Sequence, residues 1–254
     1  MPSKNVDIVF VIDASESMGP CFKEVCRNIG TLFESLRKTS FNVKIGLLAH
    51  CMPNHTTYRI LGLSSLKSVD AVDALYDMSY RNMARELLFS SDAEDFCRLL
   101  NQITPMGDED SLCALDTACD FPFGPLQNTQ RVIILLSDET FETGLPGAPS
   151  LQKIPQIIEK LHARNITLFA VLPPSRSTSE LSTANRADIE ITDNIYDGLK
   201  DFDFRGFFKQ LGKTISRNIT LLTEEPPYQR ALFDQDQWGV SQNTTVIRDK
   251  GCRQ

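Results

Sequence analysis

The chain has 254 residues, of which 41% are hydrophobic and 23% are charged, and its formal net charge at pH 7 is −7. This composition is typical of an ordinary folded protein, and the length suits one large α/β domain with a small extension. The acidic balance argues against a general binder of nucleic-acid phosphates, and no apolar run approaches the roughly 20 residues that cross a bilayer, so we expect neither nucleic acid nor membrane as a partner.

Apolar runs alternate with helical patterns along most of the chain. Apolar residues at intervals of three and four predict helices at 22–36, 91–103, 151–162 and 204–215. The second of these helices has Ser91 as its expected cap, with Glu94 completing a capping box. Continuous β-rich runs predict strands at 6–12, 41–48, 57–61, 131–138 and 166–172. This alternation predicts an α/β fold, a Rossmann-like doubly wound and mostly parallel central sheet with helices on both faces.

The character of the sequence changes near Arg217. Beyond this point there are few apolar runs, two adjacent prolines at 226 and 227, and the only Trp of the chain at 238. We therefore predict one domain at residues 5–216 and a C-terminal extension at 217–254.

Cysteine usage and the N-terminal residues bear on the cellular compartment. The first apolar run is short and is flanked by acids, which is not the pattern of a secretory signal. The seven cysteines are odd in number and scattered, which favours free thiols in a reducing compartment over a disulfide framework. We therefore expect a cytoplasmic protein, in which packing is the role of Cys21, Cys26, Cys113 and Cys119.

Polar residues follow two of the predicted strands, at the edge where doubly wound sheets bind ligands. Asp13 ends the first strand and is succeeded at alternating positions by Ser15 and Ser17, while Asp138 ends the strand at 131–138. A tight loop can turn one carboxylate and two hydroxyls toward the same point. Hard oxygen ligands of this kind suit Mg²⁺.

A third loop, at residues 105–116, supplies further oxygen atoms. Gly107 permits a turn, and three acids and Ser111 follow it at a predicted helix start, where the macrodipole favours negative charge. One of the three acids (Asp108, Glu109 and Asp110) could replace or supplement Ser111 as a ligand.

These three segments resemble the metal-ion-dependent adhesion site of von Willebrand factor A domains. The resemblance rests on D-x-S-x-S at 13–17, on LLSDET at 135–140, and on residues 107–115, which are similar to the family's G-G-x-x-T-G-x-A-L. It covers about residues 5–215. It implies Mg²⁺ or Mn²⁺ held by Asp13, Ser15, Ser17, Ser111 and Asp138.

The resemblance also implies a function. The family member would be a non-enzymatic module that binds another protein, whose Asp or Glu completes the metal shell. The chain is similar in size to free-standing cytoplasmic members of bacteria, which accompany multi-protein systems such as stress response and phage defence. Several positions depart from the family pattern. Glu16 stands where many members have Gly, and Ser111 stands where most have Thr. Small residues are expected in the third segment, where this chain has Asp108, Glu109 and Asp110.

Other interpretations of the same residues remain open. Asp13 could be the nucleophile of a Mg²⁺-dependent phosphohydrolase, although such enzymes usually carry a second acid two residues later, where this chain has Ser15. The domain could have a degenerate site that binds no metal. The Asp and Ser residues could also cap the following helix. His50, Cys51 and His55 lack a fourth nearby ligand, so we expect an incidental or structural role for them rather than a zinc site.

Overall fold

The protein is described here from a computed structural model, which defines residues 5–38, 41–50, 57–62, 65–70, 88–107, 110–142, 149–193 and 197–224. Residues 1–216 form one compact unit, and residues 217–254 form a second, of which only the helical part up to Glu224 is described. Within the described ranges, no helix combines the length and the apolar character that a membrane span requires.

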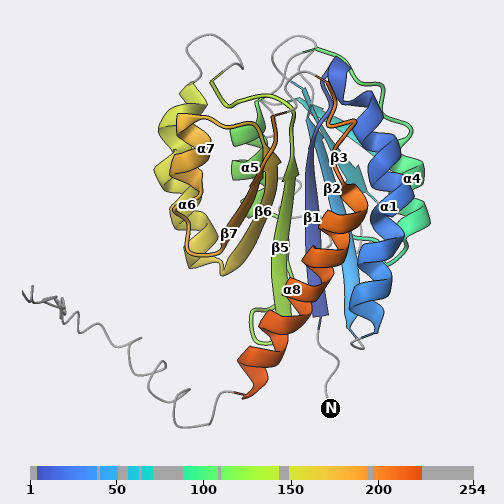
Figure 1. Ribbon diagram of the computed structural model, residues 1–254, viewed down its shortest axis with the longest axis vertical. Helices are drawn as coiled ribbons and strands as arrows, with labels where there is room; N and C mark the ends of the chain where they lie inside the picture. Colours follow the sequence, from blue (N-terminus) through green and yellow to red (C-terminus); the bar gives the residue numbers. More distant parts are fainter. Residues whose placement is uncertain are drawn as a thin grey trace, which may run out of the picture. The chain divides into compact units, whose positions relative to one another are not determined.

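A seven-stranded sheet with the order β4-β3-β2-β1-β5-β6-β7 forms the centre of the first unit (Figure 1). Two strands, β3 (Thr57–Gly62) and β4 (Ser65–Asp70), extend the sheet beyond β2 in antiparallel pairing. The other five are parallel, and they are β1 (Asn5–Asp13), β2 (Asn42–His50), β5 (Thr129–Leu136), β6 (Ile166–Leu172) and β7 (Ala187–Ile191). The predicted α/β fold with a mostly parallel sheet is therefore confirmed.

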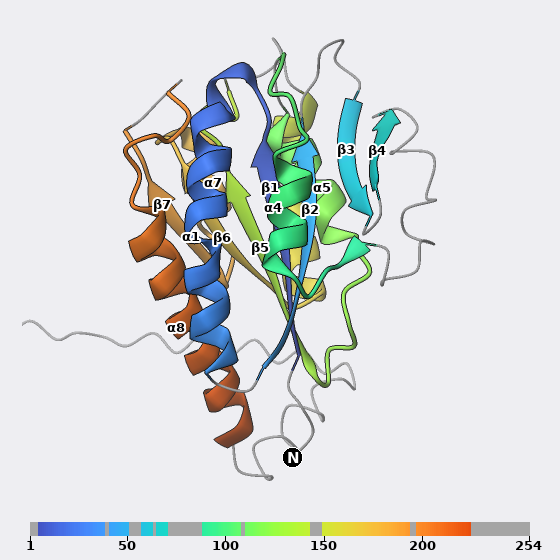
Figure 2. The same ribbon diagram turned by 90° about the vertical axis from the view of Figure 1, so that its right-hand side faces the viewer.

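Helices cover both faces of this sheet. One face carries α1 (Gly19–Arg37), α4 (Ala93–Leu100) and α8 (Phe204–Glu224), which lie toward the viewer in Figure 2. The opposite face carries α5 (Ser111–Cys119), α6 (Ile154–Ala163) and α7 (Arg176–Leu181). Two short 3₁₀ helices precede α1 and α6, and they are η1 (Glu16–Met18) and η3 (Pro149–Lys153).

The central strand β1 is buried on both faces, which explains its continuous apolar run. Val9 and Val11 belong to the core beneath α5 and α6. Phe10 points the other way, and its ring centroid lies 5.0 Å from that of Phe96 in α4 and 6.1 Å from that of Phe208 in α8. The packing of both faces holds β1 firmly, and thereby fixes the position of the polar residues at its carboxyl end.

The predicted cap of the second helix is wrong by one residue. Asp92, not Ser91, is the N-cap of α4, and its Oδ1 accepts a hydrogen bond from the Glu94 N–H at 2.8 Å. Ser90 still pairs with Ile45 in an isolated bridge, and its hydroxyl accepts a hydrogen bond of 3.0 Å from the Asp92 N–H, so the helix begins only after Asp92.

Candidate metal site at the carboxyl edge of strands β1 and β5

Two buried aspartates meet where β1 and β5 end. The two strands are parallel neighbours, so their carboxyl ends lie at the same edge of the sheet. Asp13 is the last residue of β1 and Asp138 lies two residues beyond β5, and both are 0% exposed. Ser137 joins the two loops, because its hydroxyl donates a hydrogen bond of 2.8 Å to Asp13 Oδ2.

The loop after β1 brings its two hydroxyls to the second aspartate. The Ser15 N–H donates to Asp13 Oδ1 at 2.7 Å, which folds the loop back on the carboxylate. The hydroxyl oxygens of Ser15 and Ser17 lie 3.2 Å apart, and the Ser17 hydroxyl donates to Asp138 Oδ1 at 3.1 Å. Four of the five residues predicted from the sequence as ligands therefore form one hydrogen-bonded cluster.

These residues do not cap the helix that follows them. The N-caps of η1 and α1 are Ser15 and Met18, and neither makes a side-chain capping hydrogen bond. The hydroxyls of the loop contact each other and Asp138 instead of the free N–H groups of the helix. The helix-cap interpretation of this segment is therefore wrong.

The third loop lies against the first, and Ser111 opens the helix that follows it. The Met106 N–H donates to the Ala14 carbonyl at 2.9 Å, which ties the two loops together. Ser111 is the first residue of α5 and is 6% exposed, and its hydroxyl has no hydrogen-bond partner in the described part of the chain. No hydrogen bond links it to the other four residues of the cluster.

Of the three acids of the third loop, only Asp110 lies within the described residues. Asp110 is the N-cap of α5, where its Oδ1 accepts a hydrogen bond of 2.9 Å from the Cys113 N–H. Its carboxylate therefore already has a structural role at the helix start. Asp108 and Glu109 fall outside the described residues, so their part in a metal site stays a prediction.

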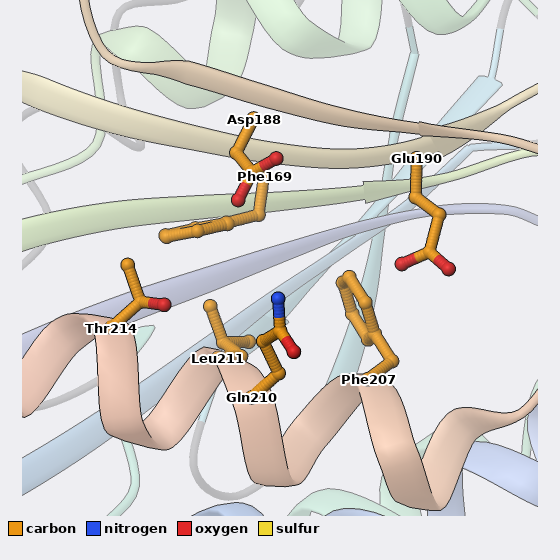
Figure 3. A pocket seen from close by; sticks show the side chains of 7 residues that line it. All are labelled: Phe169, Asp188, Glu190, Phe207, Gln210, Leu211 and Thr214. Atoms are coloured by element: carbon orange, nitrogen blue, oxygen red, sulfur yellow. The ribbon is translucent and has the colours of Figure 1, made fainter.

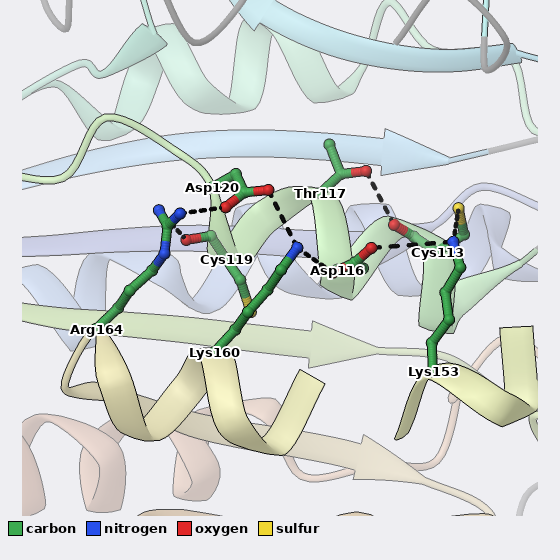
Figure 4. Close-up of polar contacts among 8 residues, drawn as sticks. All are labelled: Cys113, Asp116, Thr117, Cys119, Asp120, Lys153, Lys160 and Arg164. Atoms are coloured by element: carbon green, nitrogen blue, oxygen red, sulfur yellow. Dashed lines mark hydrogen bonds and ion pairs between the residues drawn. The ribbon is translucent and has the colours of Figure 1, made fainter. Parts of the chain in front are cut away.

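An ionic network connects α5 to α6 (Figure 4). Lys160 of α6 contacts the carboxylates of both Asp116 and Asp120, the latter at 3.2 Å. Arg164 adds an ion pair of 2.5 Å to Asp120 and a hydrogen bond of 3.1 Å to the Cys119 carbonyl. Because both acids belong to or adjoin α5, these contacts help to fix the helix that carries Ser111 at its start.

A fourth segment, which the sequence did not point to, completes the surroundings of Asp138. The backbone N–H of Gly198 donates to Asp138 Oδ2 at 2.7 Å. Gly198 has a φ of +70°, and a Cβ at this position would lie 2.2 Å from the Ser17 carbonyl oxygen. Only glycine fits this close approach, yet nothing in the neighbouring sequence signals it. Ser137 was also missed, although it stands directly before the predicted Asp138.

Burial disfavours the charged form of the Asp13 carboxyl group. It raises the pKa of Asp13 to about 7, and the nearby charge of Asp138 adds to the rise, whereas hydrogen bonds from Ser15 and Ser137 lower it. In the described ranges, no Lys, Arg or His side chain forms an ion pair with either aspartate. Two buried carboxylates thus share one small space, and none of the described Lys, Arg or His side chains pairs with them.

His50 lies beside this cluster without joining it. It is the register partner of Asp13 on β2, its carbonyl accepts the Ala14 N–H at 2.8 Å, and it is 0% exposed. Burial lowers the pKa of His50 to about 3, and neither ring nitrogen has a partner within the described residues. The backbone of His50 thus supports the loop. Cys51 and His55 lie outside the described residues, so the prediction for that trio remains open.

The donor set fits a divalent cation of the hard type. It offers two carboxylates and the hydroxyls of Ser15, Ser17 and Ser111, the last without a partner although buried. Nowhere in the described residues do three or more His, Cys, Asp or Glu side chains gather so that they could hold a metal, so a metal here would depend on hydroxyls as well as acids. These are ligands for Mg²⁺ or Mn²⁺ rather than for Zn²⁺.

A small pocket lies elsewhere, between α8 and strands β6 and β7 (Figure 3). Its volume of about 50 Å³ has room for a few water molecules, far less than a cofactor needs. Its lining shares no residue with the cluster, and consists of Phe169, Asp188, Glu190, Phe207, Gln210, Leu211 and Thr214. The carboxyl edge of β1 and β5 therefore remains the better candidate for a functional site.

Comparison with known proteins points to one family. The sequence profile of the von Willebrand factor type A domain matches residues 7–190. A von Willebrand factor type A structure from Catenulispora acidiphila is 15% identical with a TM-score of 0.51, and the match covers 82% of this chain and 42% of that one. The pilus adhesin SpaC from Lactobacillus rhamnosus GG is 13% identical with a TM-score of 0.51, covering 86% of this chain and 31% of that one.

These similarities differ in what they show. The chain spans less than half the length of either structure, and identities this low show the fold alone. No curated protein matches the sequence. The profile match, which spans most of the chain, therefore carries the family assignment.

Proposed function

The chain belongs to the von Willebrand factor type A domain family, and on this premise we propose that it is a non-enzymatic interaction module. It binds a carboxylate of a partner protein through Mg²⁺ or Mn²⁺ held at the carboxyl edge of β1 and β5. The observation that carries the proposal is the convergence of Asp13, Ser15, Ser17 and Asp138 from two loops into one cluster. The cluster is buried except at the half-buried Ser17, and no cationic side chain in the described part of the chain forms an ion pair with it.

The residues of the cluster have separate tasks in this proposal. The hydroxyls of Ser15, Ser17 and Ser111 bind the ion directly as neutral ligands. Asp13 and Asp138 supply the negative charge, and each is held in place by a hydrogen bond from outside the loop after β1, from Ser137 and Gly198 respectively. When bound, Mg²⁺ offers an electrophilic position that a carboxylate oxygen of a partner can fill.

The side of the loop that faces solvent suits a protein partner. Glu16 is exposed between the two buried or half-buried serines, so a partner meets the loop at this residue. A carboxylate of the partner approaches a site that already holds two acids, and it therefore depends on the ion to offset their charge. The relative SpaC is described as a pilus adhesin, and adhesion is a use of this kind of domain that agrees with the proposal.

A phosphohydrolase with Asp13 as its nucleophile would need a second acid, and the chain has none at the expected position. Ser15 stands two residues after Asp13, and its hydroxyl oxygen lies 3.2 Å from that of Ser17. A serine hydroxyl cannot protonate a leaving group as a carboxylic acid does. The expectation of a bacterial, cytoplasmic protein in a stress or phage-defence system stays a prediction from the sequence.

Calorimetric titration with Mg²⁺ and with Mn²⁺ tests the metal part of the proposal. We expect saturable binding to the full chain, loss of binding in Asp13→Asn, and retention in Asp7→Asn, a variant of the other buried aspartate of β1. Absence of binding by the wild type, or equal binding by Asp13→Asn, would contradict the proposal.

Water-proton relaxation with bound Mn²⁺ tests the carboxylate part. A protein-bound Mn²⁺ that keeps exchangeable waters enhances the relaxation rate, and we expect added acetate to reduce this enhancement as it displaces them. A chain whose bound Mn²⁺ gives no response to acetate has no open position for a partner. Turnover of p-nitrophenyl phosphate that Asp13→Asn abolishes would favour the enzyme instead.

A further inference from the structure

Two cysteines from different helices meet at the seam between α1 and α4. Cys26 lies on α1 and Cys97 on α4, and these helices pack side by side on one face of the sheet (Figure 2). The neighbouring residues Val25 and Phe96 point into the core and are 0% and 2% exposed, whereas the two thiols are only half-buried. The seam therefore holds both sulfur atoms near the surface, within reach of a small reagent.

The contacts between the two residues are reciprocal. Cys26 Sγ donates to the Cys97 carbonyl oxygen at 3.9 Å, and Cys97 Sγ donates to the Cys26 carbonyl oxygen at 3.8 Å. Each sulfur thus lies against the backbone of the other residue, so the two side chains run past each other across the seam. Rotation about the Cα–Cβ bonds is the movement that turns such neighbouring thiols toward each other for bonding.

We propose that Cys26 and Cys97 form an oxidation-sensitive dithiol that closes to a disulfide between α1 and α4. The inference goes beyond the proposed function and does not depend on a metal. The residues are 71 positions apart in the chain, so the bridge closes a long loop and is expected to stabilise the folded domain considerably.

The two thiols influence each other's ionisation. The interaction between their side chains lowers the pKa of Cys97 and raises the pKa of Cys26. The contacts across the seam are reciprocal, so either cysteine can attack the oxidant as its thiolate, and the other then resolves the product. The other cysteines of the described ranges are less accessible to an oxidant, because Cys21 and Cys119 are 0% exposed and Cys113 is 7% exposed.

The chemistry balances with a peroxide as the oxidant. When Cys97 reacts first, its thiolate attacks hydrogen peroxide, the O–O bond breaks, and Cys97 sulfenic acid and hydroxide form. Cys26 sulfur then attacks the Cys97 sulfur and expels its hydroxyl group, which leaves as water with the thiol proton. Together the two cysteines lose two electrons and two protons, and one peroxide becomes two waters. A dithiol reductant reverses the bridge by exchange.

Mass spectrometry of the full chain after peroxide treatment tests the proposal. We expect the intact mass to fall by two hydrogen atoms, and a digest made after blocking free thiols to contain one peptide that links Cys26 to Cys97. Dithiothreitol should restore the original mass. Thermal unfolding of the oxidised chain should show a Tm higher by about 5–10 °C than that of the reduced chain.

Variants of each cysteine supply the controls. Neither Cys97→Ser nor Cys26→Ser should form the bridge or show the rise in Tm on oxidation, and the remaining thiol of each variant should accumulate a sulfenic acid that dimedone traps. Cys51→Ser and Cys252→Ser should keep the linked peptide. The proposal is overturned if Cys26 and Cys97 stay reduced while other cysteines react, if either pairs with another cysteine, or if Cys97 goes to sulfinic acid without forming the bridge.

Discussion

Strand β1 carries a buried aspartate near each end, and the two have opposite surroundings. Asp7 and Asp13 are both 0% exposed. Asp7 Oδ2 accepts the Gly124 N–H at 2.7 Å, and its register partner on β5 is Arg131, whose guanidinium donates to the Gly124 carbonyl at 2.8 and 3.1 Å. Burial and the nearby charge of Arg164 lower the pKa of Arg131, and the charge of Asp7 partly offsets this lowering. At this end the carboxylate has a fixed donor and a nearby cation.

Asp13 has donors but no protein cation among the described residues. Its hydrogen bonds come from Ser15 and Ser137, and the charge nearest to it belongs to another carboxylate, Asp138. A buried acid that is fully compensated stabilises the fold, whereas one whose charge is left uncompensated is a cost that a ligand can remove. The comparison therefore assigns Asp7 to the structure and, under the proposed function, Asp13 to binding.

The largest difference should appear on replacing Asp13. In metal-free buffer we expect Asp13→Asn to be as stable as the wild type or more stable, because a buried charge is gone. With Mg²⁺ at about 100 times its Kd, the wild type should gain about 2.7 kcal/mol of unfolding free energy and the variant nothing. Chemical denaturation with and without Mg²⁺ measures both. A clear loss of stability of the metal-free variant would place Asp13 with Asp7 among structural acids.

The matched change at the other end should act on stability alone. Asp7→Asn removes the charge beside Arg131, and we expect a loss of about 2 kcal/mol, equivalent to a Tm lower by roughly 4–8 °C. The gain in stability from Mg²⁺ should persist in full. If Asp7→Asn has the Tm of the wild type, or gains no stability from Mg²⁺, the two aspartates do not differ in the way described.

The hydroxyl of Ser111, which follows the third loop, provides a further test of the metal site. Ser111→Ala should weaken Mg²⁺ binding about tenfold, or about 1.4 kcal/mol, because one neutral ligand is lost. Ser111→Thr keeps the hydroxyl and should bind as the wild type does. Calorimetry of the three proteins decides the matter, and unchanged affinity in Ser111→Ala would remove Ser111 from the ligand set.

Glu16 should give the smallest effect. Its side chain is exposed, so its charge acts on the site through solvent and is screened by salt. We expect Glu16→Gln to weaken Mg²⁺ binding about two- to threefold at low ionic strength, with the difference vanishing at high salt. A large loss that persists at high salt would instead identify Glu16 as a direct ligand.

The sequence predicted those parts of the fold whose burial is complete. Strands β1, β2, β5 and β6 are covered on both faces, so their apolar runs are unmistakable. Strand β7 was not predicted, because this edge strand of sequence ADIEI is half-exposed and alternates with acids. The cap of α4 was misplaced because a bridge between distant residues, Ile45 and Ser90, decides where the helix begins.

The same limit applies to the site. Asp13, Ser15 and Ser17 follow one strand at regular spacing, so their convergence could be predicted from local sequence. The support of Asp138 by Gly198 could not, since the two residues are 60 positions apart and only the folded chain reveals the contact. Local patterns thus predicted residues that gather at this edge of the sheet, whereas the hydrogen bonds that orient them come from tertiary structure.

The most direct test of the central claim is anomalous diffraction from crystals of the full chain soaked in Mn²⁺. The account predicts one strong anomalous peak bonded to the hydroxyls of Ser15 and Ser17, beside the carboxylates of Asp13 and Asp138, and no peak near Asp7. A peak held by other residues, or none at this edge of the sheet when Mn²⁺ is saturating, would contradict it.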